Sequence, residues 1–140
     1  MKKTTKTYND DMTDDVGRWL PDEGWHDLEV VTMVEGTSKA GNSKFTISFI
    51  SANDAGNGLI QDLTNIPGKR WLQRQLLEAC GIIPDENDEG RKIYNWDISD
   101  IEGQTISANI IHDKTPFIGR DGNEIIIPKP KIIAFKKITV

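Results

Sequence analysis

Only one stretch of this chain has the periodicity of an α-helix, and this limits what the chain can fold into. Within residues 67–81 the apolar side chains recur at helical spacing and share one face: Leu72, Leu76, Ala79 and Cys80. Gly81 follows the last of them, where a left-handed residue commonly ends a helix. A helix of about 12 residues is about 18 Å long, which covers one side of a small sheet but builds no bundle. We therefore expect the rest of the fold to be mostly β-strand.

Alternation of apolar and polar side chains predicts the strands. Residues 44–50 alternate strictly, and residues 105–112 do so again. Segments rich in Gly, Asn and Asp separate the apolar runs and predict turns, so that the first two strands form one hairpin and residues 113–123 the loop of another. The expected strands cover residues 24–35, 44–50, 59–63, 105–112 and 124–140. Pro128 and Pro130 confine that part of the last strand to a sheet edge or a bulge.

This order of three strands, one helix and two strands predicts a mainly β domain over residues 24–140. It fits a five-stranded barrel of the oligonucleotide/oligosaccharide-binding (OB) kind, with the helix between strands 3 and 4. The first strand is long enough to bend and to pair with two neighbours. A two-layer α+β sheet with one helix has the same order, and periodicity does not separate the two. Residues 1–23 form an acidic leader that we expect to be flexible or loosely docked.

Charge is unevenly distributed along the chain. The formal net charge of −5 argues at first sight against a nucleic-acid-binding protein, but the excess acid is local. Residues 1–35 carry four basic and nine acidic side chains, and residues 82–104 carry two and seven. Residues 36–81 carry five basic and three acidic side chains, and residues 105–140 carry six and three. The expected sheet is thus locally basic, although an ordinary solvated surface explains the counts equally well.

Several function classes have no support in the sequence. No segment reaches the roughly 18 apolar residues of a membrane span, and no signal-peptide pattern is seen, so we expect a cytoplasmic protein. The lone Cys80 excludes an internal disulfide, and His26 and His112 lack metal-site spacing. Residues 85–90 begin like a calcium loop, but Trp96 stands where a bidentate Glu is required. We expect neither enzyme activity nor a metal or other cofactor.

Four short motifs occur in order along the chain: Gly-Trp-His-Asp-Leu-Glu-Val in residues 24–30, Thr-Ser-Lys-x-Gly-Asn in residues 37–42, Leu-Leu-x-Ala-x-Gly in residues 76–81, and Asp-Ile-Glu-Gly-Gln in residues 100–104. Together they resemble a family of small bacteriophage proteins encoded among replication and recombination functions. The family was long described as of unknown function and is regarded as a group of single-stranded-DNA-binding proteins. The resemblance covers roughly residues 24–138. It implies a phage origin and brings no catalytic residues with it.

A sequence-tolerant single-strand binder needs cations for phosphates and aromatic faces for bases. In a barrel of the OB kind, strands 2 and 3 and the loops beside them supply both. The residues expected at such a site are Lys39, Lys44, Arg70, Trp71, Lys114, Phe117, Arg120 and Lys131. Phe117, between Lys114 and Arg120, is either a stacking platform or a buried loop anchor. Trp71 is either a partly exposed platform or a cover for the barrel end, and Lys131 either binds phosphate or guards a sheet edge.

We therefore expect a protein that binds single-stranded DNA in phage replication or recombination. The alternative is an acidic protein-interaction module, an inhibitor or adaptor of a host enzyme, whose acidity would mimic DNA. The leader carries acid in residues 10–23 around Trp19-Leu20. It would dock a phage or host replication or recombination protein, or compete for the DNA groove of its own domain. Whether the chain forms a homo-oligomer is left open by the sequence.

Overall fold

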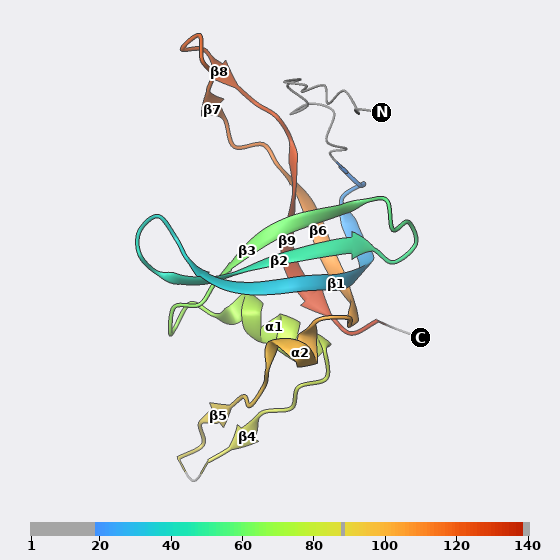
Figure 1. The fold of residues 1–140 in the computed structure, drawn as a ribbon, viewed down its shortest axis with the longest axis vertical. Helices are drawn as coiled ribbons and strands as arrows, with labels where there is room; N and C mark the ends of the chain where they lie inside the picture. Colours follow the sequence, from blue (N-terminus) through green and yellow to red (C-terminus); the bar gives the residue numbers. More distant parts are fainter. Residues whose placement is uncertain (1–18, 88, 139–140) are drawn as a thin grey trace, which may run out of the picture.

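The main sheet is antiparallel and has the strand order β3-β2-β1-β6-β9 (Figure 1). The computed structural model describes residues 19–87 and 89–138. The strands of this sheet are β1 (Gly24–Thr37), β2 (Ser43–Ser51), β3 (Gly58–Thr64), β6 (Thr105–Asp113) and β9 (Lys129–Lys136). The other elements are helices α1 (Trp71–Ala79) and α2 (Ile98–Ile101) and the short strands β4 (Asp85–Glu86), β5 (Lys92–Ile93), β7 (Phe117–Ile118) and β8 (Glu124–Ile125). The predicted mainly β fold, with α1 between the third and fourth long strands, is confirmed.

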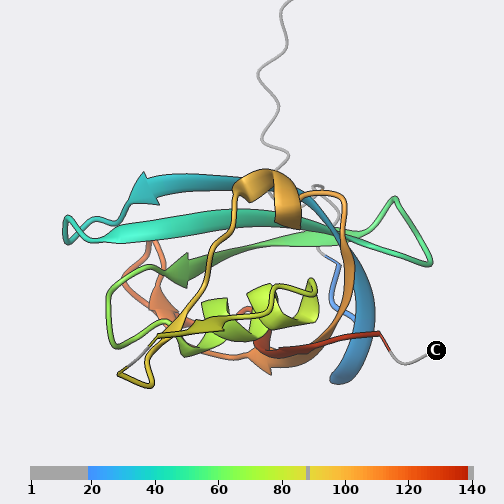
Figure 2. The ribbon, with the colours of Figure 1, turned by 90° about the horizontal axis from the view of Figure 1, so that it is seen from below.

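The long strand β1 pairs with two neighbours, as predicted. Residues 24–29 pair with β6, and residues 28–37 pair with β2. The register with β2 shifts between Val30 and Thr32. An extra residue at such a point bends a strand and increases its twist. In Figure 2 the sheet accordingly curves, so that β1, β2 and β3 lie on one side of α1 and β9 on the other.

The core lies inside the curve of the sheet. On β2 the side chains of Phe45, Ile47 and Phe49 are buried, and the polar residues between them face outward. Helix α1 buries Leu76 and packs against β9, with further contacts to β3 and β6. The partly buried Cys80 packs against this core, and burial raises the pKa of its thiol to about 11. The cysteine is therefore a neutral, space-filling side chain at physiological pH.

The sheet does not close into a hydrogen-bonded barrel. Within the described ranges, no backbone ladder joins the two edge strands, β3 and β9. Gln61 of β3 bridges them instead. Its Nε2 donates to the carbonyl oxygen of Ile132 over 2.8 Å, and its Oε1 accepts from the Ile132 N–H over 2.6 Å. Strand β9, which contains Pro130, lies at the edge of the sheet. The edge position predicted from the prolines is therefore confirmed.

Two hairpins extend from opposite ends of the domain (Figure 1). The β7–β8 hairpin lies beyond the β6–β9 pair, where the sequence predicted a hairpin loop. Strand β4 lies in the acidic segment of residues 82–90, where the sequence indicates a loop, whereas residues 94–98, between β5 and the start of α2, were left unassigned. Helix α2 begins with a local hydrogen bond, in which the Asp97 N–H donates to Asp100 Oδ2 over 2.8 Å. Of the described helices, neither has the length and apolar character needed to cross a membrane.

The end of the acidic leader contacts the domain. The expected leader covered residues 1–23, of which residues 1–18 lie outside the described part of the chain. Trp19 packs against the core cluster and meets the ring of His26 edge-on, with 5.9 Å between the ring centroids. The His112 N–H on β6 donates to Glu23 Oε2 over 2.9 Å. Residues 19–23 therefore lie against the start of β1 and the end of β6.

Candidate nucleic-acid interface

The outward side of β1, β2 and β3 forms an open surface, which we call the strand face. In the strand register Thr46 lies opposite Asp62, and Ser48 lies opposite Ile60. Ile60 is 70% exposed, and Val34, which pairs with Thr46 from β1, is 59% exposed. Exposed apolar side chains among hydroxyl groups give a flat ligand a surface on which to lie.

Lys44 lies on the strand face, but its charge is already paired. Its Nζ is 2.8 Å from Asp62 Oδ2, and the Thr46 hydroxyl donates to Asp62 Oδ1 over 2.7 Å. The hydrogen bond from Lys44, followed by that from Thr46, lowers the pKa of Asp62. Sequence reasoning missed Asp62, because nothing local marks it as the cross-strand neighbour of Lys44. The phosphate-binding role expected of Lys44 must therefore compete with this carboxylate.

The β1–β2 loop holds Lys39 beside the strand face. The loop is closed by a backbone bond from the Ser38 N–H to the Asn42 carbonyl over 2.8 Å, and the Asn42 N–H donates to Ser38 Oγ over 3.1 Å. Gly41 has a φ of 83°, which favours glycine at this turn. Lys39 is exposed, and with Lys44 it lines a hollow of about 420 Å³. We call this hollow the loop pocket.

The β7–β8 hairpin presents an aromatic ring among cations. Phe117 is 42% exposed, so it is not the buried loop anchor that the sequence also allowed. Lys129 Nζ lies 6.0 Å from the centroid of its ring. Lys114 and Arg120 are exposed in the segments before and after β7, and Asp121 stabilises the turn by accepting a backbone N–H over 3.0 Å. The Phe117 ring is therefore open to a stacking partner.

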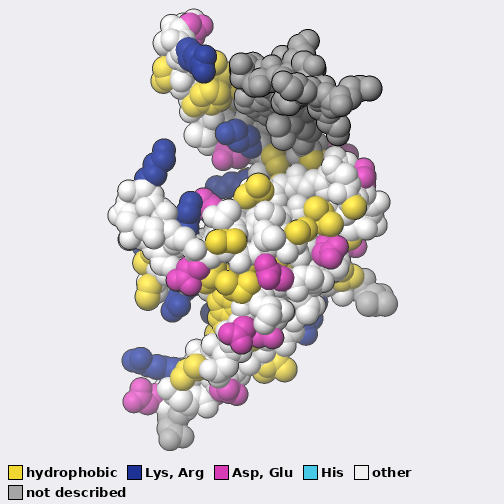
Figure 3. Space-filling model, viewed as in Figure 1, with side chains coloured by type: hydrophobic (Ala, Val, Ile, Leu, Met, Phe, Trp, Pro, Cys, Tyr) yellow, Lys and Arg dark blue, Asp and Glu magenta, His cyan; other side chains and the backbone are white. Residues whose placement is uncertain are grey.

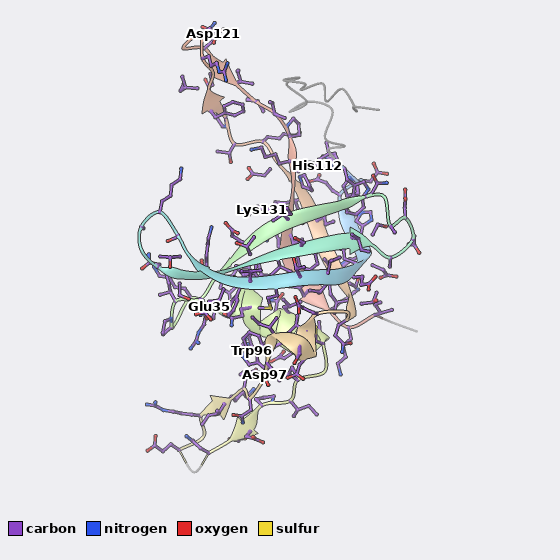
Figure 4. All side chains as sticks on the ribbon, in the orientation of Figure 1. Glu35, Trp96, Asp97, His112, Asp121 and Lys131 are labelled. Carbon is purple, nitrogen blue, oxygen red and sulfur yellow. The ribbon has the colours of Figure 1, made fainter. Side chains whose placement is uncertain are left out.

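The β1–β2 loop and the β7–β8 hairpin project as two arms beside the strand face. Figure 3 shows a hollow between the arms, with Lys and Arg side chains on both. In Figure 4 Lys131 of β9 lies between the hairpin and the strand face. Six of the eight expected residues belong to these arms and their adjoining strands: Lys39, Lys44, Lys114, Phe117, Arg120 and Lys131. Local basic character in the sequence was the signal that pointed to this surface.

Arg70 and Trp71 lie elsewhere, at the start of α1. Trp71 is 57% exposed, so it does not cover the end of the sheet as a buried side chain. Both residues line a second hollow of about 570 Å³, together with Tyr94 and Trp96. We call it the helix pocket. The eight expected residues therefore divide between two surfaces. Tyr94 and Trp96, whose roles the sequence left undecided, belong to the second one.

Neither a metal-binding cluster nor a known relative identifies the function of these surfaces. The part of the chain that the structure describes contains no cluster of three or more His, Cys, Asp or Glu side chains that could hold a metal ion. In comparisons with protein-family models and with curated proteins, nothing matches this chain. A proposal for its function therefore depends on the surfaces described above and on the short motifs in the sequence.

Proposed function

We propose that the chain is a single-stranded-DNA-binding protein of phage replication or recombination, with an OB-like architecture. One observation carries the proposal. Two arms bearing cations project on either side of a strand face with exposed apolar side chains (Figure 3). The arms are the loop between the first two strands and the hairpin between the last two long strands, which are the loops that flank the binding face in an OB fold. Because that fold is a partly open barrel, the gap between β3 and β9 is compatible with it.

The chemistry of this surface favours single strands over duplex. Lys39, Arg120 and Lys131 supply positive charge for the phosphates, and Phe117 supplies a face for a base. Stacking of a base on an aromatic side chain contributes about 1–3 kcal/mol, and every base has such a face. In a duplex the faces of the bases are already stacked on each other. The protein is therefore proposed to bind single strands with little sequence preference and without any reaction on the DNA.

Fluorescence anisotropy of a labelled oligo-dT strand of about 20 nucleotides tests the proposal. Titrations at about 50 mM and about 200 mM salt should show a loss of affinity with salt, because binding releases counterions from the strand. Duplex DNA of equal length should bind much more weakly. Lys39→Gln, Phe117→Ala and Arg120→Gln should each weaken binding, whereas Lys137→Gln, at an exposed lysine beyond β9, should not.

Two results would contradict the proposal in different ways. Absence of binding at low salt, where electrostatic attraction is strongest, would reject DNA binding and favour the acidic interaction module. Equal affinity for duplex and single strand, unaffected by Phe117→Ala, would reject base stacking and leave only general electrostatic attraction. In the first case, the next experiment is capture of a host protein by the immobilised chain.

A further inference from the structure

The helix pocket lies between α1 and the segment around β5, near the lower hairpin in Figure 1. Its lining combines basic, aromatic and amide side chains. They include Arg70, Trp71, Gln73, Arg74, Lys92, Tyr94 and Trp96. This pocket is not part of the strand face. Two of its groups have no evident role in the described part of the fold: the exposed ring of Trp71 and the unpaired side-chain oxygen of Gln73.

The charges of the helix pocket favour an anion. Each charged side chain of its lining is a cation, Arg70, Arg74 or Lys92, and no carboxylate lines it among the described residues. Arg74 Nε makes only a long contact with Glu78 Oε1, at 4.0 Å. Helix α1 begins here with no acidic residue in its first turn and no side-chain cap. The positive end of its dipole therefore adds to the positive potential of the pocket.

The aromatic side chains of the pocket provide a surface for a flat partner. Trp71 is more than half exposed at the rim. Trp96 is held in place by an edge-on contact with the core residue Phe45, with 5.5 Å between ring centroids. Tyr94 is held by its hydroxyl, which donates to Glu78 Oε1 over 2.6 Å. The pocket is therefore largely preformed, with one ring presented to solvent.

Gln73 supplies an unused hydrogen-bonding group. The residue is only 4% exposed, and its Oε1 has no hydrogen-bond partner among the described residues. A buried carbonyl oxygen without a donor destabilises a fold, so such groups are normally paired. Gln73 lines the helix pocket, so a rotation of its amide towards the pocket would let an N–H group of a bound ligand supply the missing donor.

We propose that the helix pocket binds one nucleotide of the same DNA strand that crosses the strand face. The base stacks on Trp71 with its N–H groups towards Gln73, and the phosphate lies among Arg70, Arg74 and Lys92. A nucleotide brings an anion, a flat ring and N–H donors together. An acidic side chain brings only the anion, since an ionised carboxylate has no hydrogen to donate. This inference rests on the proposed function and extends the DNA path.

The two hollows are neighbours along the chain, and in our proposal one strand runs from the first to the second. The lining of the loop pocket ends at Ile66, and that of the helix pocket begins at Gly68. Only the turn that leads from β3 into α1 separates them. A strand that leaves the strand face beside Lys44 can therefore continue over this turn into the helix pocket. A short strand that fills only the strand face would not reach it.

Strand length tests the inference in the full-length protein. Oligo-dT of about 6 and of about 20 nucleotides is titrated against the native protein, Trp71→Ala, Arg74→Gln and Lys92→Gln. Trp71→Ala should weaken binding of the long strand at least about fivefold, as expected for one lost base contact. Arg74→Gln and Lys92→Gln should each weaken it and make it less dependent on salt, as expected for a lost phosphate contact. Binding of the short strand should not change. Matched controls are Trp25→Ala, at an exposed Trp on β1, and Arg91→Gln, next to Lys92 but outside the pocket lining.

Photo-crosslinking gives a second, direct measurement. A long strand that contains 4-thiothymidine should crosslink to Trp71, identified by mass spectrometry of the peptide, whereas a strand of about 6 nucleotides should not. Suppose that Phe117→Ala weakens binding of both the short and the long strand, that the pocket substitutions weaken binding of neither, and that Trp71 does not crosslink. The inference is then wrong and the proposed function stands. If neither strand binds the native protein at low salt, both are wrong.

Discussion

Asp62 alters the charge of the strand face, although its position in the sequence gives no hint of it. The carboxylate accepts hydrogen bonds from Lys44 and Thr46, so it partly neutralises a cation on the proposed DNA surface. The Lys44 and Asp62 side chains are 29% and 51% exposed, so the pair is of modest strength. A phosphate that approaches Lys44 must therefore displace or tolerate the carboxylate.

Asp62→Asn should increase the affinity for single-stranded DNA. The substitution removes a negative charge from the strand face and leaves the Lys44 ammonium available to a phosphate, so we expect a gain of about threefold to tenfold at low salt. Anisotropy titration with oligo-dT measures it. Asp54→Asn, in the β2–β3 turn at the other end of the same hairpin, is the matched control and should have little effect. A lower affinity for Asp62→Asn would mean that the DNA does not approach Lys44.

The same pair should make stability depend on acid pH. Its hydrogen bonds lower the pKa of Asp62 below the ordinary value of 3.8, so the charged form favours the folded state. The contribution is complete above the unfolded pKa and is lost as the pH falls through the folded pKa. Native protein should exceed Asp62→Asn in stability at pH 7 by at most about 1 kcal/mol, because the pair is half exposed. In urea denaturation, a difference that does not shrink at acid pH would contradict this assignment.

At the scale of elements, the β7–β8 hairpin is separate from the main sheet. Its strands pair only with each other in the described ladders, with Phe117 opposite Ile125. Below it, the β6–β9 pair already ends at Asp113 and Lys129. Ile118 of the hairpin is 70% exposed and so does not contribute to the main core. It therefore contributes mainly surface, and its removal should separate function from folding.

Replacement of residues 115–127 by a short Gly-containing turn should leave the fold intact. We expect the Tm to change by less than about 4 °C, which corresponds to less than about 1 kcal/mol in a domain of this size. The affinity for a short oligo-dT strand should fall at least about tenfold, because the stacking ring and the cations of the hairpin are lost. Calorimetry and anisotropy measure the two effects. A variant with the β2–β3 turn shortened in the same way is the control. If the affinity of the β7–β8 variant for oligo-dT were unchanged, the hairpin would be excluded from the interface.

At the scale of the whole molecule, Gln61 links the two edges of the curved sheet. Its amide satisfies both backbone groups of Ile132. An open gap between edge strands would otherwise leave those groups without partners inside the fold. The link also holds β9, which carries Lys131, at a constant position relative to the strand face. The link therefore joins the two edges of the curved sheet that carries the proposed interface.

Gln61→Ala should destabilise the protein by about 1–3 kcal/mol, because it leaves the N–H and the carbonyl of Ile132 unpaired. The free energy of unfolding in urea measures this. Gln104→Ala, at an exposed glutamine, removes a side chain of the same type and should change stability by less than about 0.5 kcal/mol. Equal stability of the Gln61 and Gln104 variants would show that the edges of the sheet do not depend on the link.

Sequence periodicity determined the local elements of this protein. Strict alternation in residues 44–50 predicted β2, and helical spacing followed by Gly81, whose φ is 88°, predicted α1. Both signals are carried by consecutive residues, because the face on which a side chain lies depends only on backbone repeat. Two-residue strands such as β4 and β5 contain too few residues to show any period, so they were not predicted.

Only the tertiary structure decided which candidate residues share a surface. The β2–β3 pairing brought Lys44 within hydrogen-bonding distance of Asp62, which lies 18 positions away. The path of the chain placed Trp71 and Trp96 around the same pocket, away from Phe117. Curvature brought Gln61 to Ile132 across 71 positions, without closing the barrel that the strand order suggested. The physical reason is the same in each case. Charge pairing, exposure and closure depend on contacts between distant residues, and no local pattern of residue types records those contacts.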